Sequence, residues 1–194
     1  MIERFEIIAE AFRVGDMKDL PGVCDKVIRN WKDIPVEPLL ELKLQLARLG
    51  LEHREAHLDE ALISIAEKRP GPFSDIASNT DHPLWKPAVE IMSMCENPDF
   101  QEQLLSLLPG CPKRCLGDLI RAISRSGSSA ESVWPYLMDE DEGIFLEAVM
   151  AVREAGGPES VRRLKEAITQ KKREGSPSAR VLEAVLQELE RKQD

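Results

Sequence analysis

The apolar positions of the chain recur at the spacing of helices rather than of strands. Val, Ile and Thr never gather into alternating runs bounded by glycine turns, so no strands are expected. Residues 52–68 predict a helix with a buried stripe at Leu58, Leu62 and Ile65. The segment that Pro35 opens contains leucines at helical spacing, separated by residues that favour helices: Leu39, Leu42, Leu46 and Leu49.

Proline and glycine divide the chain into short segments, each of which predicts one helix. Gly127 and Gly156 follow two of these segments, where a left-handed cap residue is needed. The stretch 69–82 begins with the helix-breaking run Arg69-Pro70-Gly71-Pro72 and predicts a loose, flexible joint within a single domain over residues 1–194. Helices are expected near these ranges: 2–14, 20–31, 35–50, 52–68, 81–94, 98–108, 113–126, 129–138, 142–155, 158–174 and 178–192.

Two segments in the second half of the chain can be aligned with each other. Residues 119–127 match residues 148–156, which puts Ala122 in register with Ala151, 29 positions apart. A third alanine, Ala184, follows at the corresponding place in the last predicted helix. Small residues let neighbouring helices approach closely, and helix pairs that cannot bury both faces alone stack on one another. The sequence therefore predicts stacked helix pairs, most clearly over residues 113–192.

One stretch carries a family resemblance. Residues 133–168 read Val-Trp-Pro-Tyr-Leu and an acidic run, then a helix that ends at Gly156, then a second helix that begins with Pro158. This pattern resembles HEAT-like repeats of the short bacterial type that phycobilin lyases also contain. The resemblance implies an all-α superhelix of antiparallel helix pairs. The sequence departs from it at Gly143, near a position that is often basic, and in a repeat shorter than the usual ~40–47 residues. A non-repetitive helical bundle is the alternative.

Composition and charge limit the partners and the cellular compartment that we expect for this protein. Thirty-five acidic and 26 basic residues give a net charge of −9, which disfavours binding to nucleic acid or to anionic lipid. No stretch approaches the ~18 apolar residues of a membrane span, and the first residues do not resemble a signal peptide. None of the cysteines has CxxC spacing, so free thiols in a reducing cytoplasm are expected: Cys24, Cys95, Cys111 and Cys115.

A small basic island in the second half is the candidate binding site. By the resemblance to HEAT-like repeats, the second helix of each pair lines a concave face. Basic side chains there imply a protein or peptide partner of acidic character, whereas scattered surface charge is the alternative. The residues placed on this face are as follows: Lys113, Arg114, Arg121, Arg125, Glu147 and Glu154.

Two weaker constellations suggest chemistry. His53 and His57 are one helical turn apart, with Glu60 on the same face, and such a set can bind Zn²⁺. A solvated polar face explains the three residues better, so no metal or cofactor is expected. Cys111 and Cys115 flank two cations at a predicted helix start, which can activate a thiol, but no histidine lies nearby to act as a base.

The function that these observations favour is a non-catalytic scaffold or adaptor that binds another protein. A cofactor-attachment or maturation factor is the alternative that the resemblance to phycobilin lyases implies, and a nucleic-acid-binding HEAT-like protein is disfavoured by the charge. The sequence contains no Ser/His/Asp set and no glycine-rich phosphate loop. Of the tryptophans, Trp134 is expected in the core.

Overall fold

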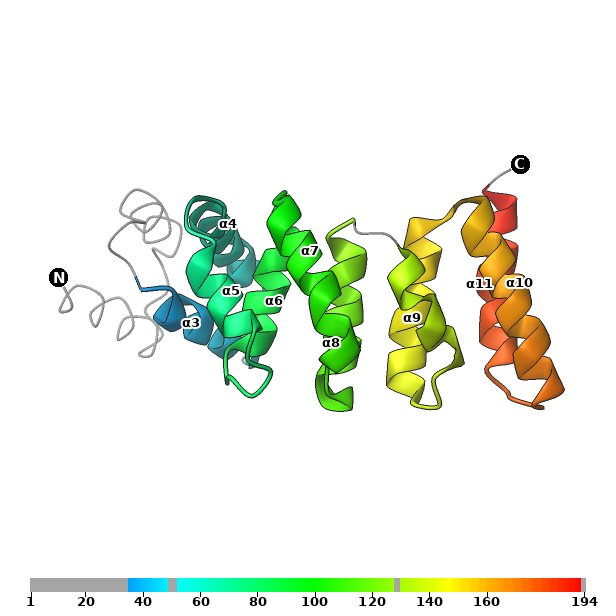
Figure 1. Ribbon diagram of the computed structural model, residues 1–194. Helices are drawn as coiled ribbons and strands as arrows, with labels where there is room; N and C mark the ends of the chain where they lie inside the picture. Colours follow the sequence, from blue (N-terminus) through cyan, green and yellow to red (C-terminus); the bar gives the residue numbers. More distant parts are fainter. Residues whose placement is uncertain (1–34, 49–51, 128–129, 193–194) are drawn as a thin grey trace. The chain divides into compact units, whose positions relative to one another are not determined.

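The computed structural model describes residues 35–48, 52–127 and 130–192, and the regular elements in these ranges are all helices (Figure 1). The predicted all-α class is therefore confirmed for this part of the chain. The helices predicted over 2–14 and 20–31 lie outside it. The elements are as follows: α3 (Val36–Arg48), α4 (Glu52–Lys68), α5 (Gly71–Ala77), α6 (Trp85–Met94), α7 (Pro98–Leu107), η2 (Leu108–Gly110), α8 (Lys113–Arg125), η3 (Ala130–Met138), α9 (Glu142–Ala155), α10 (Gly157–Arg173) and α11 (Ala179–Arg191).

The helix boundaries follow from capping residues. Helix α9 begins after Asp141, whose carboxylate accepts hydrogen bonds from the backbone N–H groups of Gly143 and Ile144 at 2.9 and 3.2 Å. This satisfies two of the donors that a helix start leaves unpaired. The same helix ends at Gly156, which has φ +60°, and α8 is followed by Gly127 with φ +72°. Both glycines thus have the positive φ that favours glycine, although Gly156, with ψ −158°, lies outside the left-handed helical region that was predicted for it.

The stretch 69–82 differs from the loose segment that its prolines and glycine predict. Residues 71–77 form helix α5, in which Phe73 and Ala77 are fully buried. Proline is tolerated in the first turn of a helix, because the N–H group that it lacks has no partner there. The prolines of this stretch therefore begin a helix instead of preventing one. The predicted flexibility of the stretch stays a prediction.

The segment 129–138 also differs from expectation, because η3 is a 3₁₀ helix rather than an α-helix. Pro135 lies inside it. A proline in a helix interior removes one backbone donor and clashes with the preceding turn, so a regular α-helical ladder cannot run through this residue. At nine residues, η3 is longer than most 3₁₀ helices, which rarely exceed about four residues.

The chain forms two compact units, Met1–Phe100 and Gln101–Asp194. In the first unit, α3 packs against α4 and both contact α6, which also packs against α5. The predicted stripe of α4 is buried here, with Leu58, Leu62 and Ile65 at most 1% exposed.

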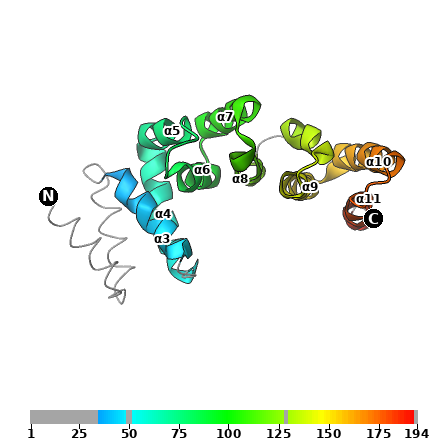
Figure 2. The same cartoon turned by 90° about the horizontal axis from the view of Figure 1, so that it is seen from below.

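The second unit has its helices in two rows, which are seen end-on in Figure 2. In what we call the second-helix row, α9 packs against α8 on one side and α11 on the other. In the first-helix row, η3 packs against α10, and η3 also covers α9 while α10 covers α11. The aligned alanines Ala122 and Ala151 are both buried between these helices, whereas Ala184 is exposed.

None of the helices in the described ranges has the length and apolarity required to cross a bilayer.

Candidate protein-binding surface

An ion pair joins α8 to α9 at the centre of the predicted basic island. The guanidinium of Arg121 donates two hydrogen bonds to the carboxylate of Glu147, one of them at 3.0 Å between Nε and Oε2. Asp118 lies 3.7 Å from the same guanidinium. Planar, two-point pairing of this kind fixes geometry as well as charge. The structure therefore brings two of the predicted site residues together, as partners of each other.

The remaining predicted site residues do not form one cluster. Glu154 accepts a hydrogen bond of 2.6 Å from the hydroxyl of Ser124, which is a second polar link between α8 and α9. Lys113 lies 3.8 Å from the carboxylate of Asp139, at the other end of α8. Arg114 and Arg125 are exposed at opposite ends of the same helix. Acidic side chains thus accompany the basic ones on this face, which carries no concentrated positive charge.

A second ion pair joins α9 to α11. Arg153 lies 2.8 Å from the carboxylate of Glu188, measured from Nε to Oε2, and both side chains are partly exposed. Hydrogen bonds from Arg153 and Lys192 hold the pKa of Glu188 at about 2, well below its usual value. The central helix of the second-helix row is therefore tied by ion pairs to the helices on both of its sides.

Two apolar side chains occupy the exposed strip of α9 between these ion pairs. Leu146 is 41% exposed and Met150 is 42% exposed, one helical turn apart. At about 100° per residue, Glu147 and Glu154 project to the α8 side of this strip and Arg153 to the α11 side, in agreement with their partners. We call Leu146 and Met150 the α9 strip.

A hollow of about 340 Å³ lies where α8, η3 and the C-terminal end of α9 meet, and neither Leu146 nor Met150 lines it. Its walls are mostly small or apolar, and the Ser124–Glu154 hydrogen bond stands at its edge. The candidate surface is therefore the apolar strip with a polar link on each side, an arrangement that resembles the apolar centre and polar rim of protein interfaces. Sequence reasoning missed the strip because Leu146 and Met150 fit the general apolar character of α9.

The two weak chemical constellations gain no support. Burial, followed by the nearby Cys115, raises the pKa of the Cys111 thiol to about 11, so this thiol is not an activated nucleophile. Glu60 is exposed on α4, while the side chains of His53 and His57 lie outside the described residues. Among the side chains that the structure describes, no group of three or more metal-ligating residues converges.

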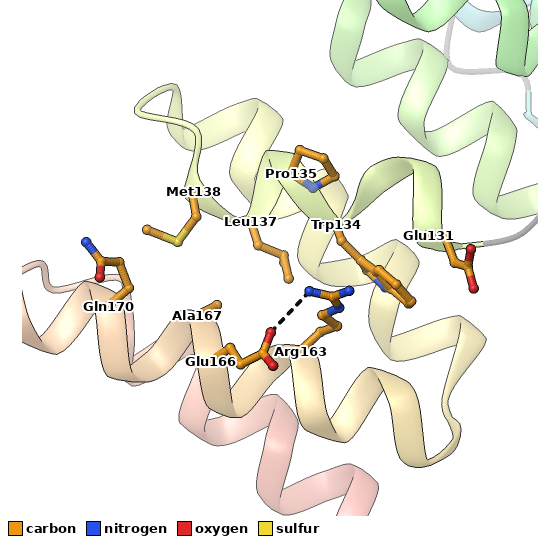
Figure 3. A pocket seen from close by; sticks show the side chains of 9 residues that line it. All are labelled: Glu131, Trp134, Pro135, Leu137, Met138, Arg163, Glu166, Ala167 and Gln170. Atoms are coloured by element: carbon orange, nitrogen blue, oxygen red, sulfur yellow. Dashed lines mark hydrogen bonds and ion pairs between the residues drawn. The ribbon is translucent and has the colours of Figure 1, made fainter.

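A separate groove of about 440 Å³ lies in the first-helix row, between η3 and α10 (Figure 3). Trp134 lines this groove and is only half-buried, so its predicted place in the core is wrong. Arg163 of α10 covers the face of the indole, with 4.6 Å between the guanidinium carbon and the ring centroid.

No protein-family model matches the sequence, and no curated protein is significantly similar to it.

Proposed function

We propose that this protein is a non-catalytic helical-repeat scaffold that binds another protein or a peptide through its second-helix row. The arrangement of the second unit supports the proposal, because its helices alternate along the chain between two rows, as in HEAT-like stacks of helix pairs. Surfaces of this kind present a continuous series of helix faces to a partner. The exposed face of α9, the middle helix of its row, is the proposed centre of the interface.

The observation that carries the proposal is the α9 strip between its two cross-helix ion pairs. Protein interfaces commonly place apolar anchors at the centre and polar groups at the rim, where they exclude water and fix orientation. Burying the exposed part of Leu146 and of Met150 would each contribute about 1 kcal/mol, as less than half of each side chain is still accessible. The flanking charges would contribute specificity more than affinity.

The ion pair between Arg121 and Glu147 must be preserved in any variant that tests binding at this site. Reversing the charge of Arg121 alone removes a contact between α8 and α9, so lost binding would not distinguish recognition from local destabilisation. The exchange of Arg121→Glu with Glu147→Arg keeps a pair between the same helices and reverses its direction. Met150→Glu introduces a charge into the α9 strip without touching the Arg121–Glu147 pair. Because the sulfur of Met150 lies 3.9 Å from Nη1 of Arg153, Leu146→Glu is made beside it as a second substitution in the same strip.

The experiment is a capture of partners from lysate of the native host on immobilised protein, followed by binding measurements with the purified partner. We expect Met150→Glu and Leu146→Glu each to weaken binding at least tenfold, because a charge would replace an apolar side chain in the buried interface. The charge exchange at Arg121 and Glu147 should retain the fold and reduce affinity for a partner of acidic character. Arg173→Glu, at an exposed position of α10, is the matched control and should bind normally. Equal binding by wild type and Met150→Glu would contradict the proposal.

A further inference from the structure

The groove in the first-helix row is independent of the proposed interface and has the features of a second binding site. It lies between η3 and α10, and its volume of about 440 Å³ is within the range of ligand sites in proteins. Leu137, Met138 and Ala167 form an apolar floor, and Trp134 and Pro135 line the η3 side (Figure 3).

The indole N–H of Trp134 is the feature that requires an explanation. Its nitrogen is buried and has no hydrogen-bond partner in the structure. Buried tryptophan N–H groups normally have an acceptor, and Trp85 follows that rule by donating to the carbonyl oxygen of Ala77 at 2.9 Å. The group that covers the Trp134 ring is the guanidinium of Arg163, which carries only donors and cannot satisfy the N–H. None of the side chains that line the groove accepts a hydrogen bond from this N–H.

The charge of the rim limits which acceptor can enter. Glu131 and Glu166 both line the groove and are exposed, and Gln170 adds an uncharged polar group. Arg163 also lines the groove and pairs with Glu166, so the lining keeps one more carboxylate than guanidinium. This net negative charge disfavours a ligand that brings its acceptor as an anion. They favour a ligand that combines neutral carbonyl oxygens with positive charge.

We propose that this groove binds an extended, proline-rich peptide segment flanked by lysine or arginine. The carbonyl oxygens of a polyproline II segment make no hydrogen bonds within the segment, so one is available to the Trp134 indole N–H. The proline rings and neighbouring apolar side chains fill the floor, in the manner of other aromatic-lined grooves that recognise such peptides. The basic flanks pair with Glu131 and, in place of Arg163, with Glu166.

Arg163 must move aside for the peptide to reach the indole. Its guanidinium lies 3.2 Å from Glu159 and 3.2 Å from Glu166, in exposed or half-exposed contacts. Ion pairs of this kind contribute little to stability, so the side chain can rotate at small cost. A cation of the peptide can then replace the guanidinium over the indole ring.

The probe is a fluorescent decapeptide of Pro and Leu residues with arginine at both ends, titrated with the full-length protein. Fluorescence anisotropy should show saturable binding. Trp134→Phe, which keeps an aromatic ring and removes the N–H, should weaken it at least about fivefold. Glu131→Gln combined with Glu166→Gln should also weaken it. Met150→Glu, on the other row, should not, so this result is separable from that for the proposed interface.

Two further readouts protect against a variant that misfolds. In ¹H–¹⁵N spectra of the wild type, the Trp134 indole signal should shift on addition of the peptide, as expected for an N–H that gains an acceptor. Peptides with glutamate at both ends, or with glycine in place of proline, should bind more weakly. Absence of saturable binding, an unmoved indole signal, or equal binding by the glutamate-flanked peptide would each overturn the proposal.

Discussion

A buried lysine in the first unit leads to a specific stability prediction. Lys43 of α3 is 2% exposed, and its ammonium lies 2.8 Å from a carboxylate oxygen of Asp59 on α4 and 3.4 Å from one of Glu90 on α6. The three charges thus join three helices of one core. Asp59→Asn keeps the shape of the side chain and removes its charge, so that the buried ammonium loses its closer counter-ion.

The expected loss follows from the burial of each group. Removing one partner of a fully buried ion pair costs about 3–5 kcal/mol, because the remaining charge is left uncompensated. Here Asp59 is 19% exposed and Glu90 still faces the ammonium, so the cost should be reduced to about 2 kcal/mol. Glu90→Gln should cost less, about 0.5–1 kcal/mol, since Glu90 is 36% exposed and lies farther away.

The assay is urea unfolding at pH 7, followed by far-ultraviolet circular dichroism and by amide hydrogen exchange in α4 and α6. Asp59→Asn should lower the free energy of unfolding by about 2 kcal/mol and increase exchange in both helices. Lys68→Met, at an exposed position at the end of α4, serves as a surface control and should change the free energy of unfolding by less than about 0.5 kcal/mol. The reasoning fails if Asp59→Asn is no more destabilising than Lys68→Met, or if Glu90→Gln has the larger effect.

Three further predictions concern the second unit. Gly156→Ala should lower the free energy of unfolding in urea by about 1–3 kcal/mol, since φ +60° with ψ −158° is a region for glycine alone. Gly110→Ala is the control: an added Cβ there meets nothing within 4 Å, and the loss should be far smaller. Cys111, with its pKa raised to about 11, should be alkylated more slowly at pH 8 than an unfolded-state thiol, as measured by peptide mass spectrometry. Glu188 should titrate near pH 2 by NMR, and its pKa should return toward the usual value in Arg153→Met. Because the folded-state pKa is depressed, the contribution of Glu188 to stability is present above the ordinary glutamate pKa and is lost as the pH falls toward 2.

The periodicity of the sequence was sufficient to predict most helices, because local signals set their ends. Helices α4 and α9 have the predicted bounds, and Gly127 and Gly156 follow their helices with positive φ. Such features depend on residues close together in the chain. The prolines of 69–82 misled the prediction, because proline signals both the end of a helix and its first turn.

The features that define the candidate sites depend on contacts between distant residues. Lys43 is one of the helix-favouring residues between the leucines of 35–50, and its burial depends on acidic side chains from two other helices. Arg121 was predicted to recognise a partner, but it pairs with Glu147, 26 positions along the chain. Trp134 was expected in the core and instead lines a groove with Arg163. No local pattern specifies these neighbours.

The central claim is that a partner protein contacts the face of α9 in the second-helix row. The most direct measurement is site-specific photo-crosslinking in lysate of the native host, with a benzophenone amino acid at position 150 and, for comparison, at position 173 of α10. Met150 is 42% exposed in the α9 strip, so a reactive group there should yield a discrete protein adduct that position 173 does not yield. No adduct from position 150, or the same adducts from both positions, would contradict the claim.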